Sequence, residues 1–295
     1  MPGKPGVVPL VARSSHSLLR GTAGVDALVQ QAAALGHPAL ALTDRNNIYG
    51  LVAFRKATAA AGIDPIHGAE IDDPITGARA VLLVRTMAGY ENLCRLITRR
   101  MMEPKFCLAA ALGAPGNSFR NESTLLGSDH VDGRHILTAT DPLDGLHLLT
   151  DDESLIRALH PHMAPNRLWI LLADPPRLAT DWQHLAALGR ELKRPLVASP
   201  DVMYLTESDR EQHRLVTAIR ERELVTRVTP DAMAPPGSHL PDGRKILERF
   251  RDFPSALVNN RLIRTFTSRS DDAQSASVAS IEPPITRHPR IMVTQ

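Results

Sequence analysis

Three acidic residues occupy positions in this sequence at which a metal site or an acid–base site could form. Asp44, Glu70 and Asp201 each follow a short apolar run of the kind that forms a buried β-strand. In a barrel of parallel strands the strand ends converge on one face, so three such carboxylates could bind divalent cations or act as general acid and base. Acidic residues also follow strands as caps of the next helix, and the pattern alone leaves both interpretations open.

Other catalytic patterns are missing from the sequence. It contains no Gly-x-Ser-x-Gly nucleophile elbow, no His-Glu-x-x-His pair and no glycine-rich phosphate loop. Two cysteines, Cys94 and Cys107, are too few for a disulfide framework or a four-cysteine zinc site. We interpret both as ordinary thiols of a reducing cytoplasm.

The apolar spacing predicts alternating strands and helices that would position the acids. A helix ending at Gly36 precedes a strand over 39–42, and a helix over 48–60 precedes a strand that ends near residue 70. This alternation is typical of a parallel sheet or barrel. The same reasoning predicts further strands over 80–84, 145–149, 168–172 and 196–198, and helices over 91–102, 153–160, 178–192, 209–222 and 244–250.

Length and composition restrict the class of protein. The chain has 295 residues, of which 43% are hydrophobic and 22% charged, so it can bury a sizeable core. It has neither the ~20 uninterrupted apolar residues of a membrane span nor a secretory signal, so we expect a cytoplasmic protein. The formal net charge of +2 supplies no global field for nucleic acid, and any DNA contact would need a local patch.

Five motifs follow one another along the chain: ALALTD (39–44), NNIYG (46–50), GAE (68–70), GYENLCRL (89–96) and PLVA (195–198). Together they resemble the PHP (polymerase and histidinol phosphatase) domain at the N-terminus of bacterial C-family DNA polymerases. The similarity is strongest to the replicative α subunit and its error-prone relative. It runs in the same order from about residue 7 to residue 265 and is weakest between 103 and 140. The resemblance implies an α/β fold, a distorted (β/α)7 barrel.

The departures from the family pattern concern metal ligands. In metal-binding members the resemblance places a His-x-His motif at 11–13, an Asp-His pair at 44–45, a histidine near 79 and an Asp-x-His motif at 201–203. Here the three acids are retained and each of these histidines is replaced. The substituted positions are Val11, Arg13, Arg45, Arg79 and Met203.

These replacements remove the ligands that a transition metal requires. Valine and methionine cannot stand in for imidazole on zinc or manganese, and arginine offers no lone pair. We therefore expect no bound metal, with zinc or manganese on Asp44, Glu70 and Asp201 as the alternative. Because buried carboxylates repel one another, we expect Arg13, Arg45 and Arg79 to neutralise them in an arginine–carboxylate cluster.

One nearby histidine, His16, could stand in for a lost ligand. It lies three residues beyond Arg13, and an odd displacement along an extended segment reverses the facing of a side chain. We therefore do not expect His16 to be a ligand.

The resemblance also suggests how the chain is divided. We expect a PHP-like barrel over 1–228, with an irregular excursion at 103–140, and a helical junction over 229–266 similar to the lead into the polymerase palm. Residues 267–295 are poor in periodicity, and we expect them to be a disordered tail. The paired catalytic aspartates of the family's palm would lie beyond Gln295, so we do not expect a polymerase alone.

Three functional hypotheses remain open at this point. The first is a metal-free structural or accessory module linked to DNA replication or repair synthesis, with a C-family polymerase chain or other replication and repair proteins as partners. The second is a divalent-metal phosphoesterase or 3′–5′ exonuclease, as the resemblance also allows. The third is a decayed fragment without a selected role, against which the orderly hydrophobic pattern argues.

Overall fold

The computed structural model describes residues 6–114, 141–176 and 181–265. Within them, seven strands form one sheet in the order β1-β7-β6-β5-β4-β3-β2. The strands are β1 (Val11–Ala12), β2 (Ala39–Arg45), β3 (Asp64–Asp72), β4 (Arg79–Val84), β5 (Leu146–Thr150), β6 (Leu168–Asp174) and β7 (Leu196–Val202).

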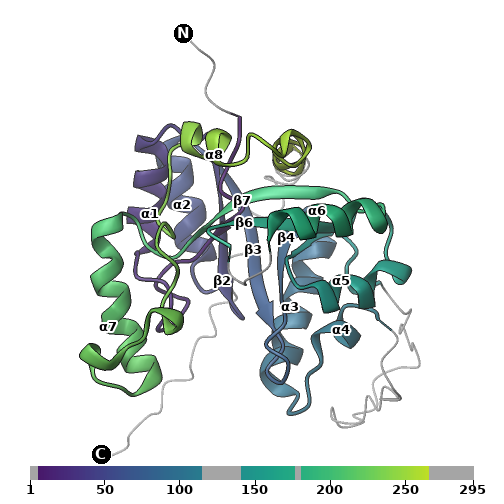
Figure 1. Ribbon diagram of the computed structural model, residues 1–295, viewed down its shortest axis with the longest axis horizontal. Helices are drawn as coiled ribbons and strands as arrows, with labels where there is room; N and C mark the ends of the chain where they lie inside the picture. The colour runs from purple at the N-terminus through teal and green to yellow at the C-terminus, as the bar shows by residue number, and fades with distance from the viewer. Residues whose placement is uncertain (1–5, 115–140, 177–180, 266–295) are drawn as a thin grey trace, which may run out of the picture.

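Helices alternate with these strands and cover the outside of the sheet. Figure 1 shows α1 and α2 on one side and α3, α5 and α6 on the other. The predicted helices and strands are present, although α6 begins only at Trp182, and residues 178–180 lie outside the described part. The helices are α1 (Val25–Ala34), α2 (Leu51–Ala61), α3 (Met87–Met102), α4 (Leu108–Ala111), α5 (Glu153–Leu159), α6 (Trp182–Glu191), α7 (Arg210–Glu221) and α8 (Gly243–Arg249), and residues 254–265 are also helical.

The two edges of the sheet meet, so that it curls into a nearly closed barrel. The backbone amide of Ala41 in β2 donates to the carbonyl of Pro9 at 2.9 Å, just before β1. The hydroxyl of Thr43 accepts from the amide of Ala12 and donates to its carbonyl, both at 3.1 Å. These contacts join β2 to β1 and confirm the distorted (β/α)7 barrel.

One strand departs from the parallel arrangement that the sequence predicts. β4 is antiparallel to both β3 and β5. The six residues between β3 and β4 are too few for the crossover of a dozen or more residues that parallel strands need. The carboxylate of Asp73 closes this turn by accepting from the amides of Ile75 (2.9 Å) and Thr76 (3.0 Å).

Strand alternation divides the apolar side chains between two cores. In β2, Ala39 and Ala41 belong to the cluster inside the barrel, whereas Leu40 and Leu42 pack among the residues of α1 and α2. Successive side chains of a strand point to opposite faces, which explains the division. The same alternation determines which polar side chains at the strand ends lie on one face of the sheet and can contact one another.

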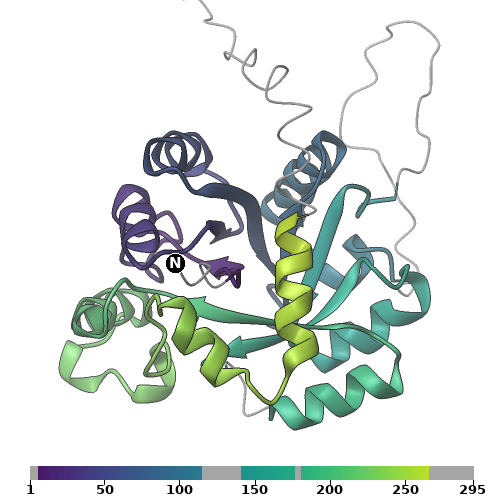
Figure 2. The same cartoon turned by 90° about the horizontal axis from the view of Figure 1, so that it is seen from above.

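The helix over 254–265 closes the end of the barrel at which the parallel strands begin (Figure 2). Its Asn260 is fully buried, accepts from the amide of Val8 at 3.0 Å, and donates to the carbonyls of Val8 (2.8 Å) and Ala198 (2.9 Å). Ile263 joins the apolar cluster inside the barrel. Periodicity did not predict this helix.

The predicted division at residue 228 stays a prediction, but the described residues after it pack on the barrel. Ile246, Phe250 and Ala256 share a buried cluster with β6 and α6 residues. Of the expected excursion at 103–140, residues 115–140 lie outside the described part, as does the expected tail at 267–295. Among the described helices, none is long and apolar enough to cross a membrane.

We predict that Asn260→Ala lowers the free energy of unfolding by about 2–4 kcal/mol, because three buried hydrogen bonds are lost and the backbone of Val8 is left unpaired. Urea denaturation followed by circular dichroism measures the change. Val258→Ala is the matched control, since Val258 lies on the same helix and is 61% exposed. Equal stability of the two variants would contradict the role of Asn260.

Candidate functional site

The guanidinium of Arg13 lies at the end of the barrel where most strands end, buried between two of the retained acids. Arg13 directly follows β1 and is 0% exposed. Its Nη1 donates to Oδ1 of Asp201 at 2.5 Å, and its Nη2 donates to Oε2 of Glu70. One side chain therefore joins the ends of β1, β3 and β7.

Two more substituted positions lie in β1 and directly after β7. Val11 lies two residues before Arg13, on the same strand face, and packs inside the barrel. The sulfur of Met203 accepts from Nη1 of Arg13 at 3.6 Å. Glu70 and Asp201 lie within the last residues of their strands rather than just after them, so strand pairing fixes their positions.

Asp44 takes no part in this arginine cluster, which corrects the sequence-based expectation. Its Oδ1 accepts from the amide of Ser14 at 2.8 Å and the hydroxyl of Ser17 at 2.6 Å, and its Oδ2 accepts from the hydroxyl of Ser14 at 2.7 Å. The physical reason is strand parity, because Asp44 alternates with Thr43 and shares the helix-facing side of β2 with Leu42. Its carboxylate holds the loop that follows Arg13.

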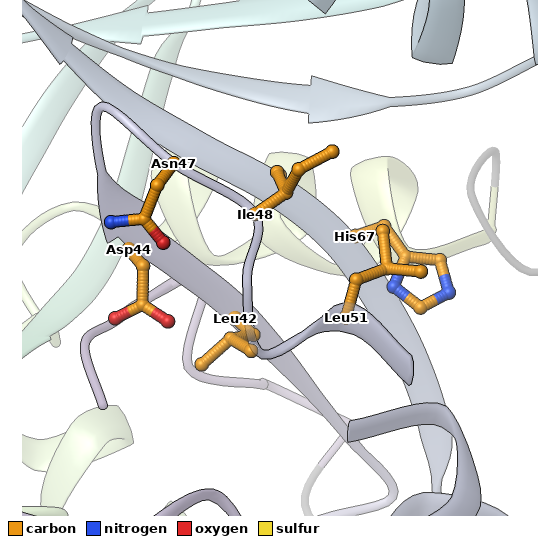
Figure 3. A pocket seen from close by; sticks show the side chains of 7 residues that line it. Leu42, Asp44, Asn47, Ile48, Leu51 and His67 are labelled. Carbon is orange, nitrogen blue, oxygen red and sulfur yellow. The ribbon is translucent and has the colours of Figure 1, made fainter. Parts of the chain in front are cut away.

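A small pocket lies beside Asp44, between β2, β3 and the start of α2 (Figure 3). Burial, with a smaller contribution from the charge of Arg55, lowers the pKa of His67 in its wall to about 4, so this imidazole is neutral at pH 7. Across the described ranges, no group of three or more His, Cys, Asp or Glu side chains could hold a metal ion. The pocket is lined by Leu42, Asp44, Asn47, Ile48, Leu51, His67 and Gly68.

The expectation that Arg45 neutralises the three acids is wrong. Its Nε donates to Oδ2 of Asp72 at 3.1 Å, and its Nη2 donates to the same oxygen. The other oxygen of Asp72 accepts from Asn46 at 2.6 Å and from Arg100 at 2.9 Å. Burial acts to raise the pKa of Asp72. The hydrogen bonds from Arg45, Asn46 and Arg100, together with the charge of Arg45, outweigh burial and lower the pKa.

Sequence reasoning missed this second ionic cluster, although one signal was present. Asp72 lies two residues after Glu70 and therefore on the same face of β3. Arg45 stands opposite Glu70 in the register, and its long side chain reaches forward to Asp72. Arg100 comes from the end of α3, a contact that no local pattern indicates.

Arg79 and His16 were the remaining predicted positions. Arg79 begins β4 opposite Asp72, and its carbonyl accepts from the hydroxyl of Thr150 at 2.7 Å. Its predicted role as a charge partner of the three acids stays a prediction. His16 lies in the loop after β1, where its amide donates to the hydroxyl of Ser14 at 3.2 Å.

Comparison with known proteins agrees with the resemblance drawn from the sequence. Residues 10–124 match the PHP domain. The chain is 31% identical to the error-prone DNA polymerase of Symbiobacterium thermophilum across 97% of its length, and 30% identical to DNA polymerase III subunit alpha of Pseudomonas aeruginosa across 85%. This chain carries a PHP domain related to DNA polymerase III subunit alpha. It spans only 27% and 22% of those two polymerases.

Solved structures give weaker similarity to this PHP domain. A two-domain protein from Bacteroides vulgatus, described as containing a predicted PHP-like metal-dependent phosphoesterase, has a TM-score of 0.41 with 11% identity, over 69% of this chain and 55% of that one. An amidohydrolase from Chromobacterium violaceum with bound sulfate and no metal has a TM-score of 0.40 with 15% identity, over 82% of this chain and 96% of that one.

The side chains of this PHP domain do not fit a zinc or manganese centre. Arg13 donates to an oxygen of Glu70 and to an oxygen of Asp201, and a cation placed there would face a permanent positive charge. Asp44, the third acid, points to the other side of β2, and its oxygens accept from serine donors. Within residues 6–114, 141–176 and 181–265, these acids are therefore not gathered with other His, Cys, Asp or Glu side chains into a set of three metal ligands.

We predict that Arg13→Met lowers the free energy of unfolding by about 3–5 kcal/mol, because it leaves two buried carboxylates without their cation. Adding Glu70→Gln and Asp201→Asn to this variant should recover part of the loss, since the uncompensated charges are then removed. Urea denaturation measures all three proteins.

Arg45→Met provides the comparison. Arg45 is 22% exposed and its partner Asp72 keeps Arg100, so we expect a loss of only about 1 kcal/mol. If Arg13→Met cost no more than Arg45→Met, the buried cluster would not be the stabilising contact.

Proposed function

We propose that this chain is a metal-free structural or accessory module of a C-family DNA polymerase system, linked to DNA replication or repair synthesis. The observation that carries the proposal is the guanidinium of Arg13 between Glu70 and Asp201. It supplies fixed positive charge at the place where the family resemblance puts metal ligands.

The chemistry of a guanidinium supports a structural role. It donates hydrogen bonds to carboxylates in a fixed geometry and stays charged at every physiological pH. It has no lone pair, so it cannot bind and acidify a water molecule as a divalent metal does in a phosphoesterase. The Arg13 cluster therefore joins the ends of three strands but offers no hydrolytic nucleophile.

The relatives support a polymerase context. They are named as an error-prone DNA polymerase and as DNA polymerase III alpha subunits, and they align with most of this chain. We propose that the barrel acts beside the catalytic part of such a polymerase, either as part of the same polypeptide or as a separate one. Its location would then be the bacterial cytoplasm, as the sequence analysis expects.

We predict fewer than about 0.1 zinc or manganese ions per chain after dialysis against an excess of either metal, because the ligands are engaged or replaced. Mass spectrometry of the metal content of tag-free protein measures this. As a positive control, the variant Val11→His, Arg13→His, Arg45→His, Met203→His should gain bound metal.

A stoichiometric metal in the unmodified chain, lost in Glu70→Gln, would overturn the metal-free proposal. It would favour the alternative, a divalent-metal phosphoesterase or 3′–5′ exonuclease that uses Asp44, Glu70 and Asp201. Hydrolysis of a phosphodiester substrate would then be the next assay.

We predict that the chain forms a complex with the C-family DNA polymerase of its own organism. Size-exclusion chromatography of the two purified proteins measures co-elution. The triple variant Arg13→Met, Glu70→Gln, Asp201→Asn should co-elute as well, since the cluster is buried and acts on the fold. Separate elution of the unmodified chain would argue against an accessory role for a separate polypeptide.

A further inference from the structure

Helix α7 carries a buried histidine, His213, on the face that packs against the rest of the chain. Its side chain is 1% exposed, and Thr217, one helical turn further along, is buried on the same face. The ring of Tyr204, which follows β7, lies beside the imidazole with 5.8 Å between the ring centroids. His213 therefore belongs to the contact between α7 and the barrel.

Both ring nitrogens of His213 form hydrogen bonds to the backbone. Nδ1 lies 2.9 Å from the carbonyl oxygen of Arg20 in the loop between β1 and α1, and Nε2 lies 2.9 Å from the amide nitrogen of Ala234. A carbonyl can only accept and an amide can only donate, so the proton must be on Nδ1 and the lone pair on Nε2. These two contacts therefore require the neutral imidazole.

The charges that face this imidazole are positive. Arg20 faces it from the loop after β1, and Arg210 and Arg220 face it from α7 itself. Burial makes the largest contribution to the lowered pKa of His213. The three arginines act in the same direction, and the hydrogen bond to the carbonyl of Arg20 opposes them. Tyr204 brings no charge, because burial raises the pKa of its phenol.

An imidazolium at this position would have no carboxylate to pair with in the part of the chain that the structure describes. Arg214, also in α7, lies 3.9 Å from a carboxylate oxygen of Glu211, and Asp231, three residues before Ala234, is exposed. A second proton on His213 would therefore turn an N–H toward the amide of Ala234 and add a positive charge among arginines.

We propose that His213 is a pH-sensitive latch that joins three separate segments, namely α7, the loop between β1 and α1, and the segment around Ala234. While the imidazole is neutral, it holds the carbonyl of Arg20 on one side and the amide of Ala234 on the other. Protonation at Nε2 breaks the bond from Ala234 and loosens α7 from the other two segments. The latch requires neither a polymerase partner nor a metal, so its test is separate from those of the proposed function.

Arg220 provides a second connection among the same segments, and this one does not titrate. Its Nη1 donates to the carbonyl of Leu19 at 3.2 Å, and its Nη2 donates to the carbonyl of Ala232 at 2.6 Å. The guanidinium stays charged at neutral and mildly acidic pH. Acid should therefore loosen α7 locally and leave the barrel folded.

The pH dependence has a definite direction. Because the fold lowers the pKa of His213, the latch contributes fully above about pH 6.5, the ordinary pKa of histidine. Its contribution is lost as the pH falls below that value and through the pKa of the folded state.

Amide hydrogen exchange followed by mass spectrometry tests the latch. Between about pH 7.5 and pH 5, after correction for intrinsic exchange rates, the protection of α7 should fall about tenfold. Helix α3 is the internal reference because it contains no histidine, and its protection should change much less. Unchanged protection in α7, or an equal fall in α3, would overturn the proposal.

His213→Gln separates this histidine from the other titrating groups. A glutamine amide can also donate and accept hydrogen bonds, but it does not titrate, so α7 in this variant should lose the pH dependence. His162→Gln is the matched control, because His162 is exposed, and it should keep the fall of the unmodified chain. If His213→Gln kept the same fall, another group would be responsible and the latch would be wrong.

A second measurement needs no variant. Nitrogen-15 NMR of the His213 ring distinguishes the nitrogen that carries the proton from the one with the lone pair. The ring should carry its proton on Nδ1 at pH 7.5 and gain the second proton below pH 6.5, in parallel with the loss of protection in α7. A proton on Nε2 at pH 7.5, or a second proton gained without any change in α7, would contradict the proposal.

Discussion

The end of the barrel at which most strands end, its mouth, depends on one buried guanidinium, that of Arg13. Glu70 and Asp201 end strands that are not neighbours in the sheet, and each is almost completely shielded from water. Two buried carboxylates repel each other and lose the stabilisation of water, and a cation beside them offsets both effects. Arg13 supplies that cation from the end of β1, the strand at which the sheet closes on itself. The closure that brings the end of β1 next to β2 therefore also brings Arg13 between the two acids.

The polar groups around the mouth divide into separate sets. Asp44 holds the loop after Arg13 through its two serine partners, while Asp72 gathers Arg45 and Arg100 at the rim. Asp44 and Asp72 thus have donors of their own, separate from the guanidinium that joins Glu70 and Asp201.

The opposite end of the barrel is closed by a different kind of contact. Asn260 pairs with the backbone of Val8 and Ala198, and Ile263 fills the interior beneath the strands. The helix over 254–265 is therefore part of the barrel's core, whatever follows it in the chain. A boundary drawn at residue 228 would separate these side chains from the strands on which they pack.

The sequence by itself determined much of the fold. Helical and strand periodicity predicted most elements, and the motifs around Asp44, Glu70 and Asp201 led to the PHP family. It also indicated that the family's histidine ligands are replaced here, because the residue type at each motif position can be compared directly with the family pattern. The alternation of strands and helices predicted parallel strands throughout, so it did not predict that β4 is antiparallel. The connection between β3 and β4, which is too short for a parallel crossover, is nevertheless visible in the sequence.

Only the tertiary structure decided which charges meet. Arg13 and Arg45 look equivalent in the sequence, yet one is buried between Glu70 and Asp201 and the other binds Asp72. Strand parity and register determine this outcome, since a shift of one residue moves a side chain to the other face of the sheet. The contacts of Arg100 and Asn260 likewise depend on segments far apart in the chain. Their partners depend on how the barrel closes, and local sequence patterns do not predict that closure.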